Sequence, residues 1–274
     1  MEHKVMDAKA LMMDVINRKE HPELYKGFKT GYKYIDNLTG GFYPGQLVTI
    51  SSYEFGRKCI PYCILNNMLL KSNIPCALFS YEEGFDEIGM QLLHYSSGID
   101  YGKIRMNFLS DEMNKKIKDS VLNISSARFI AEECHLMDFE SLCNAIRRQC
   151  SLQDLNVIFI HTLNALPLEK EIGTRKERFG TIVQKLKRLA LELNVCIILP
   201  YYIEDSEKEK TLEQKTSFLR ILSDVNLMLV PDSVEQSNVN LKYELTISIN
   251  GGIISGSTKL FLNMQKNEFI EISF

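Results

Sequence analysis

The sequence lacks tryptophan, a C-x-x-C pair and any apolar run long enough to cross a bilayer. A membrane-spanning helix needs about 18 or more apolar residues in a row, and a secretory signal needs an apolar core near the N-terminus. Neither pattern is present, so we expect a cytoplasmic protein without membrane contact. The seven cysteines are an odd number without zinc-ligand spacing, which favours buried, reduced thiols over a disulfide or metal framework.

The chain also lacks a strong excess of either charge. It has 32 Lys and Arg against 35 Asp and Glu, for a formal net charge of −3. Binding to nucleic acid would therefore need a local basic patch, because the overall charge does not favour it. With 274 residues, 45% of them hydrophobic, the chain is long enough for one large α/β domain or two small ones.

One stretch has the frame of a phosphate-binding loop without its usual residues. Residues 47–50 form an apolar strand-like run, residues 51–58 a short loop, and residues 59–71 a helix-like segment. The phosphate-loop pattern is Gly, four residues, Gly-Lys, then Ser or Thr. Here its four defined places are taken by Ser51, Gly56, Arg57 and Lys58.

This loop is the candidate site for a nucleotide or another anion. Its amides and the dipole of the following helix favour a negative charge even without hydrolysis. The candidate binding residues are those that line the loop and open the helix: Ser51, Phe55, Gly56, Arg57, Lys58 and Cys59. The alternative is that these residues form a structural turn that binds no ligand.

Strand-like and helix-like segments alternate along most of the chain, which predicts an α/β fold. The predicted strands are 47–50, 76–80, 128–131, 156–160, 195–199 and 225–230, and the predicted helices are 59–71, 85–97, one or two within 101–124, 138–150 and 179–193. A charged loop is predicted over 203–215. The alternation indicates a mostly parallel sheet with helices on both faces, and ligands then bind at the carboxyl ends of the strands. Segments 243–249 and 257–262 alternate in polarity and predict an antiparallel hairpin around residues 250–252.

An amphipathic helix is expected ahead of this body, over residues 5–19. Its apolar side chains recur at helical spacing, and Pro22 ends it because the residue before proline avoids helical geometry. The apolar face must be buried, either on its own domain or on a neighbouring subunit. We therefore divide the chain into a linker helix, 1–28, and a main domain, 29–274.

Five segments in order carry a family resemblance. They are 30–47, with its Thr-Gly-Tyr and Leu-Thr-Gly-Gly-Phe motifs, 79–82, 156–163, 185–195 and 250–260. Together they resemble the RecA-like C-terminal motor domain of DnaB-type replicative helicases, a P-loop NTPase fold of superfamily 4. The resemblance covers about residues 10–274 and implies that the helix at 5–19 is the linker that docks on the adjacent subunit of a ring.

The departures from this family lie where the resemblance places its chemistry. Arg57 and Lys58 stand where the family has the phosphate Lys and the Mg²⁺-binding Ser or Thr, and His161 ends the Walker B strand in place of Asp. Glu82 alone matches a catalytic group, the water-activating carboxylate. The remaining altered positions are Pro200 and Tyr201 in place of a Ser-Gln sensor, and Ile247 and Ile249 in place of a Lys and an Arg that reach the neighbouring subunit's nucleotide.

These replacements favour a member of the family that has lost ATP hydrolysis and assembles with itself or with a helicase ring. ATP or another phosphate anion stays open as a ligand, and the replaced side chains argue against Mg²⁺. One alternative is an active ATP-dependent helicase in which Arg57, Asp205 or Asp224 supplies the missing groups. Another is a loader or inhibitor that mimics a helicase subunit.

A charged segment, predicted as a loop over 168–178, lies where the resemblance places the DNA loop of the central channel. Its basic residues are interleaved with glutamates, so it is either a single-stranded DNA contact or a solvated charged loop. The candidate DNA-binding residues are Lys170, Arg175, Lys176 and Arg178.

Overall fold

The computed structural model describes residues 5–53, 58–167, 173–203, 211–237, 240–263 and 268–271. Four residues named above, Phe55, Gly56, Arg57 and Lys170, and the alternative metal group Asp205, lie outside the described residues.

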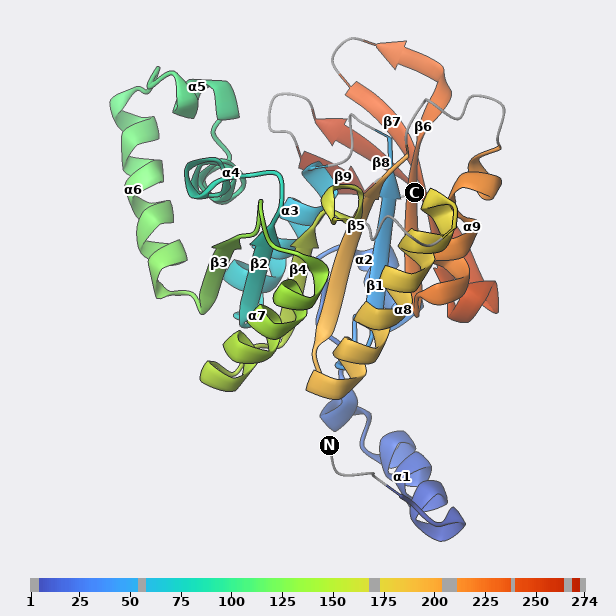
Figure 1. Ribbon diagram of the computed structural model, residues 1–274. Coiled ribbons are helices and arrows are strands. Elements are labelled where there is room, and N and C mark those ends of the chain that lie inside the picture. The colour runs from blue at the N-terminus through green and yellow to red at the C-terminus, as the bar shows by residue number, and fades with distance from the viewer. Residues whose placement is uncertain are drawn as a thin grey trace.

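A nine-stranded sheet runs through the molecule (Figure 1). In the order β3-β2-β4-β5-β1-β6 neighbouring strands are parallel, and β7, β8 and β9 continue the sheet antiparallel. The strands are β1 (Leu47–Ser52), β2 (Cys76–Ser80), β3 (Phe129–Glu133), β4 (Val157–His161), β5 (Cys196–Tyr202), β6 (Val225–Ser237), β7 (Asn240–Ile249), β8 (Ile254–Asn263) and β9 (Glu268–Glu271).

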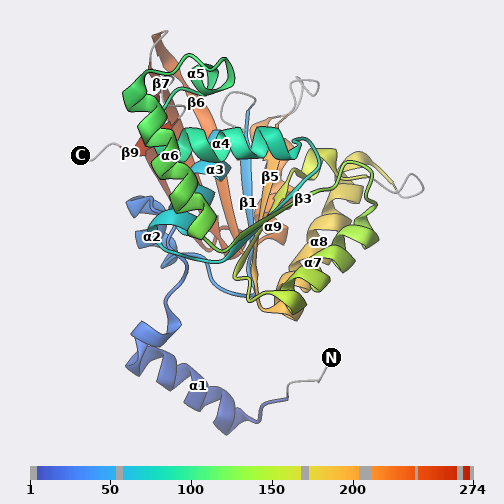
Figure 2. The ribbon, with the colours of Figure 1, turned by 90° about the vertical axis from the view of Figure 1, so that its left-hand side faces the viewer.

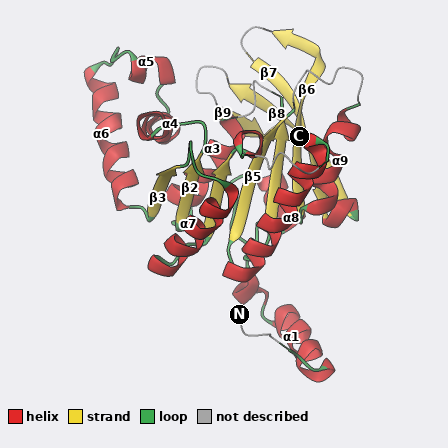
Figure 3. Ribbon diagram, viewed as in Figure 1, coloured by secondary structure: helices red, strands yellow, loops and turns green. Residues whose placement is uncertain are grey.

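Helices cover both faces of the sheet, as Figures 2 and 3 show. One face carries α2 (Lys33–Thr39), α3 (Cys59–Asn66), α4 (Phe85–Ser97) and α6 (Asp111–Ser126), and the other carries α7 (Phe139–Leu152), α8 (Arg175–Leu193) and α9 (Leu212–Leu222). The remaining helical segments are α1 (Ala8–Glu20), α5 (Tyr101–Arg105), a π-turn at Asn67–Lys71 and 3-10 turns at Pro22–Tyr25, Leu163–Ala165 and Asn250–Gly252.

The central strands are apolar on both faces because helices bury both. In β1, Val48 and Ile50 belong to the core cluster shared with α3, whereas Leu47 belongs to the cluster shared with α7 and α8. Side chains alternate along a strand, so each layer of helices receives every second residue. This arrangement fixes the end of β1, and with it the start of α3, at the carboxyl edge of the sheet.

The N-terminal helix α1 stands apart from this body. None of its residues is buried, and Leu11 and Ile16 are 48% and 44% exposed. Figure 1 shows it below the sheet. The structure therefore does not show the apolar face of α1 packed on its own domain, which was one of the two alternatives for this face.

The predicted strands and the terminal hairpin are confirmed, but two predicted loops are partly wrong. Helix α8 begins at Arg175, inside the loop predicted over 168–178, and α9 begins at Leu212, inside the charged loop expected around 203–215. Both helices start with a capping box, Thr174 with Glu177 and Thr211 with Gln214. This pairing satisfies backbone N–H groups of the first turn. It marks the start of a helix, although the charged residues around it had indicated a loop. Helix α2 and strand β9 were not predicted.

Candidate functional site

The candidate site lies at the carboxyl edge, where β1, β2, β4 and β5 end side by side. The cross-strand pairs Ser80–His161 and Ser52–Tyr202 place the last residues of these four strands in two adjacent rows. Helix α3 starts close to the end of β1, with Lys58 at its N-cap position. The topology thus brings Lys58 and His161 to the same edge, as the sequence predicted.

A buried carboxylate that the sequence analysis overlooked joins these residues. Glu83 is 2% exposed, and its Oε1 lies 2.7 Å from the Nζ of Lys58. The hydroxyl of Tyr62 donates to Glu83 Oε2 at 2.5 Å, and the Nδ1 of His161 lies 3.6 Å from the same oxygen. Burial by itself raises the pKa of the Glu83 carboxyl, but the combined effect of its three neighbours holds that pKa below its ordinary value.

The cluster extends from Glu83 to β5. Tyr202 places its hydroxyl 3.0 Å from the Nε2 of His161, and both side chains are buried. Burial and the nearby carboxylate of Glu83 raise the pKa of Tyr62 far above its ordinary value, so Tyr62 is a neutral donor. Its ring stacks on Tyr95 of α4, with centroids 5.9 Å apart. Lys58, Tyr62, Glu83, His161 and Tyr202, which we call the edge cluster, therefore connect α3 to the ends of three strands.

Glu82, the predicted catalytic carboxylate, lies next to this cluster. It is exposed and accepts a hydrogen bond from Thr162 Oγ1 at 2.9 Å. The backbone N–H of Glu83 donates to Ser80 Oγ at 2.8 Å, and the turn that this bond closes sends the second glutamate inward. No signal in the sequence distinguishes the two adjacent glutamates, and a catalytic role for Glu82 stays a prediction.

Two of the predicted anion-binding side chains do not point at the loop. Ser51 follows Ile50 in β1, and since Ile50 faces α3, Ser51 faces the opposite layer. Cys59 is 1% exposed, with its sulfur 4.0 Å from that of Cys63 in the core. Of the predicted anion-binding residues that the structure describes, Lys58 lies at the carboxyl edge, and its side chain forms an ion pair with Glu83.

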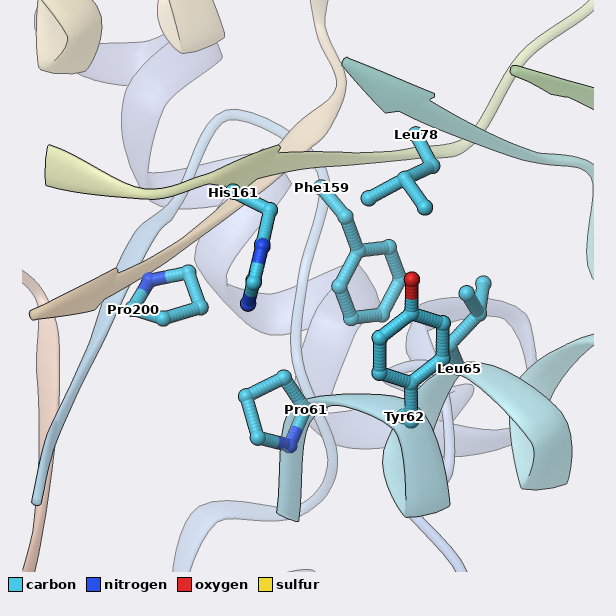
Figure 4. Close-up of a pocket in the computed structure, with 7 residues that line it drawn as sticks. All are labelled: Pro61, Tyr62, Leu65, Leu78, Phe159, His161 and Pro200. Atoms are coloured by element: carbon cyan, nitrogen blue, oxygen red, sulfur yellow. The ribbon is translucent and has the colours of Figure 1, made fainter. Parts of the chain in front are cut away.

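A small apolar pocket lies between α3 and strands β2, β4 and β5, beside the side chain of His161 (Figure 4). The volume of this pocket is about 10 Å³, enough for the centre of one water molecule. It is lined by Pro61, Tyr62, Leu65, Leu78, Phe159, His161 and Pro200.

The residues at the expected ligand positions do not fit Mg²⁺. The ion prefers oxygen ligands in octahedral geometry and keeps several of its waters. The side chains at the two expected ligand positions, Lys58 and His161, carry nitrogen in place of oxygen. Among the described residues, no group of three or more His, Cys, Asp or Glu is placed to hold a metal ion.

Asp224, considered as a substitute metal group, lies at the wrong edge of the sheet. Its carboxylate accepts a hydrogen bond from the N–H of Leu47, the first residue of β1, at 2.7 Å, and it forms an ion pair with Lys187. Leu47 begins the strand whose far end leads to Lys58. Asp224 therefore stabilises the start of β1 and is separated from the edge cluster by the length of that strand.

The other altered positions are built into the core. Tyr201 packs edge-on between Phe179 and Phe218, with centroids 5.8 Å from each. Ile247 is fully buried and Ile249 packs against the same core cluster. The side chains of Ile247 and Ile249 thus face the core of the chain's own domain.

The predicted DNA-binding residues that are described lie in the first turn of α8, not in a loop. Arg175 places its guanidinium 5.1 Å from the centroid of Phe179. Lys176 Nζ lies 3.1 Å from the carbonyl oxygen of Gln214 and 3.3 Å from Ser217 Oγ, so it ties α8 to α9. Arg178 is half-buried.

The family is shown by a direct match. The model of the "DnaB-like helicase C terminal domain" family matches residues 27–226, well over half of the chain. The chain belongs to this family. The residues that carried the resemblance in the sequence lie in this match for the most part, with the terminal hairpin beyond it.

Curated DnaB helicases are also similar to this chain. Replicative DNA helicase DnaB of Treponema pallidum is 27% identical over 195 residues, which cover 69% of this chain and 44% of that protein. The same helicase of Leifsonia xyli is 24% identical over 221 residues, covering 80% of this chain and 47% of that protein. The chain thus spans less than half the length of the curated relatives it matches.

Solved structures confirm the RecA-like fold. The "ATPase Domain of G40P" superposes with a TM-score of 0.83 at 18% identity, covering 97% of this chain and all of that domain. A DnaB-like replicative helicase studied with its primase interactions gives a TM-score of 0.80 at 18% identity, covering 98% of this chain and 68% of that one. Among the described residues, no helix has the length and apolar character to span a membrane.

Proposed function

We propose that this DnaB-like chain is a non-hydrolysing member of its family. It acts in the cytoplasm in DNA replication or a related DNA transaction, by assembling with itself or with an active helicase ring. One observation carries the proposal. The side chain at the family's Ser/Thr metal-ligand position is an ammonium, Lys58, and the chain itself supplies its counter-charge, Glu83.

The chemistry of phosphoryl transfer supports the loss of turnover. In P-loop enzymes the metal ion and fixed cations supply most of the stabilisation of the transition state. Loss of one cation from the neighbouring subunit costs on the order of 10³-fold or more in rate. Here Lys58 and His161 replace both metal-ligand positions, and Ile247 is buried where a cation would be needed.

The N-terminal helix supports assembly. Residues 1–28 would form the linker and residues 29–274 the motor-type domain. An amphipathic helix that leaves its apolar face in water is unfavourable, and α1 exposes several apolar side chains at 40% or more. Docking of α1 on a second subunit of the ring removes this surface from water.

Single-stranded DNA is the second partner in the proposal. Arg175 and Lys176 are exposed at the start of α8, directly after the segment that contains Lys170. Binding of a fluorescent oligo(dT) followed by anisotropy should weaken as salt rises. Arg175→Ala should reduce the salt slope by about one if this residue contacts a phosphate. An unchanged slope would remove Arg175 from the DNA contact.

A steady-state ATPase assay with Mg²⁺, with and without single-stranded DNA, tests the proposal. We expect no turnover above the buffer rate. Glu82→Gln is the control, because contaminating ATPases are insensitive to it. Turnover that disappears in Glu82→Gln would overturn the proposal in favour of an active helicase.

A further inference from the structure

We propose that the Lys58–Glu83 ion pair is a built-in substitute for the metal–nucleotide contact, which holds α3 against the ends of β2 and β4 without a ligand. The stability and assembly of the chain then do not depend on nucleotide. The inference rests on the proposed function, because it explains how a family member without turnover keeps its nucleotide edge in one conformation.

The geometry supplies a continuous polar connection across the carboxyl edge. Lys58 caps α3, and Glu83 lies in the turn between β2 and α4. From Glu83 the contacts continue to His161 at the end of β4 and to Tyr202 at the end of β5, over 3.6 Å and 3.0 Å. Tyr62, one turn into α3, binds the second carboxylate oxygen. A bound metal and nucleotide would join these same elements.

The burial of Glu83 makes this pair different from a surface ion pair. Exposed pairs contribute about 0–1 kcal/mol because water screens both charges. Glu83 is 2% exposed, whereas the Lys58 side chain retains 30% of its exposure. A buried carboxylate that loses its cation is strongly unfavourable, while an ammonium that loses its carboxylate can turn toward solvent. The two single substitutions should therefore have unequal effects.

The first experiment is a double-mutant cycle on the melting temperature. We expect Lys58→Met to lower it by about 5–15 °C, because an unpaired carboxylate stays buried. Glu83→Gln should lower it less, and the double variant should recover at least half of the loss in Lys58→Met. Lys259→Met is the matched control, because Lys259 forms an ion pair with Asp232 at the surface. This variant should shift the melting temperature by less than about 2 °C.

Additive single effects in this cycle would overturn the inference. Where Lys58→Met does not fold, Lys58→Arg keeps the charge, and it should retain most of the wild-type stability. A loss in Lys58→Arg as large as that in Glu83→Gln would also contradict a charge-based contact.

The second experiment asks whether ligand replaces the pair. Melting temperature and oligomer distribution by native mass spectrometry should be the same with Mg-ATP, with ATP and EDTA, and with inorganic phosphate. A ligand that binds the native state at 100 times its Kd would stabilise it by about 2.7 kcal/mol, which is easily seen. A ligand-induced rise without ATP turnover would overturn this inference alone, whereas ATP turnover would overturn the proposed function.

Discussion

The ammonium of Lys58 lies 2.7 Å from the buried carboxylate of Glu83, across the gap between the start of α3 and the turn after β2. Lys58 stands where the family resemblance expects a metal ligand, and Glu83 follows the residue that matches the catalytic carboxylate. The pair places a fixed positive charge and its counter-charge where an active relative would need an exchangeable ion.

The stability of the protein should depend on the ionisation of Glu83. Its pKa in the folded state lies below the ordinary value of 4.5, so its contribution is fully present above about pH 4.5 and is lost as the pH falls through the folded-state pKa. We expect the difference in unfolding free energy between wild type and Glu83→Gln, from urea titrations, to shrink on acidification. Other carboxylates cancel in this difference. A difference that grows on acidification would mean that the folded-state pKa is raised instead.

The two tyrosines of the edge cluster should contribute unequally. Tyr62→Phe leaves a buried, charged oxygen of Glu83 without one of its donors, at a cost of about 1–3 kcal/mol. Tyr202→Phe removes a hydrogen bond with His161 and should cost about 0.5–1.5 kcal/mol. Urea denaturation of both variants measures this, and Tyr62→Phe should also move the acid transition to higher pH. An acid transition that does not move in Tyr62→Phe would show that the Glu83 carboxylate does not depend on Tyr62.

The apolar face of α1 should matter for assembly and not for folding of the subunit. Leu11→Lys with Ile16→Lys changes two exposed side chains, so we expect a melting-temperature shift of less than about 2 °C. Self-association, from analytical ultracentrifugation, should weaken by at least about tenfold, or 1.4 kcal/mol. The matched control is Asn17→Lys, which adds a charge at an exposed polar position of the same helix. Equal weakening in the control would point to charge alone.

Metal-dependent nucleotide binding should be recoverable by substitution. The triple variant Arg57→Lys, Lys58→Thr and His161→Asp restores the residue types that the family has at these positions. We expect calorimetry to detect ATP binding that requires Mg²⁺, at least about tenfold tighter than in wild type. Turnover should stay absent, since Ile247 supplies no cation to a neighbouring site.

The control for this experiment is Lys58→Thr alone, which removes the ammonium but leaves His161 in place. It should bind Mg-ATP no better than wild type and should unfold more readily, because Glu83 loses its cation. Binding by this single variant that equals the triple would show that Lys58 alone excludes the metal.

Much of the fold was predictable because apolar periodicity follows burial. The buried runs in β1, β2, β4 and β5 are nearly continuous in the sequence, and they are the four central strands of the parallel part of the sheet. The starts of α8 and α9 were missed because charged residues there suggested loops. Their capping residues, Thr174 and Thr211, are local signals that the sequence does contain.

The sequence by itself determined the strand–loop–helix frame at residues 47–71 and the identities of Arg57, Lys58 and His161, which depart from the family pattern. Only the tertiary structure decided that Glu83, not its exposed neighbour Glu82, faces Lys58. Two consecutive side chains in a turn diverge, and their directions depend on a hydrogen bond to Ser80 and on which strands lie beside β2. Sequence periodicity carries no information about either, so the partner of Lys58 becomes visible only when the strand ends meet at one edge.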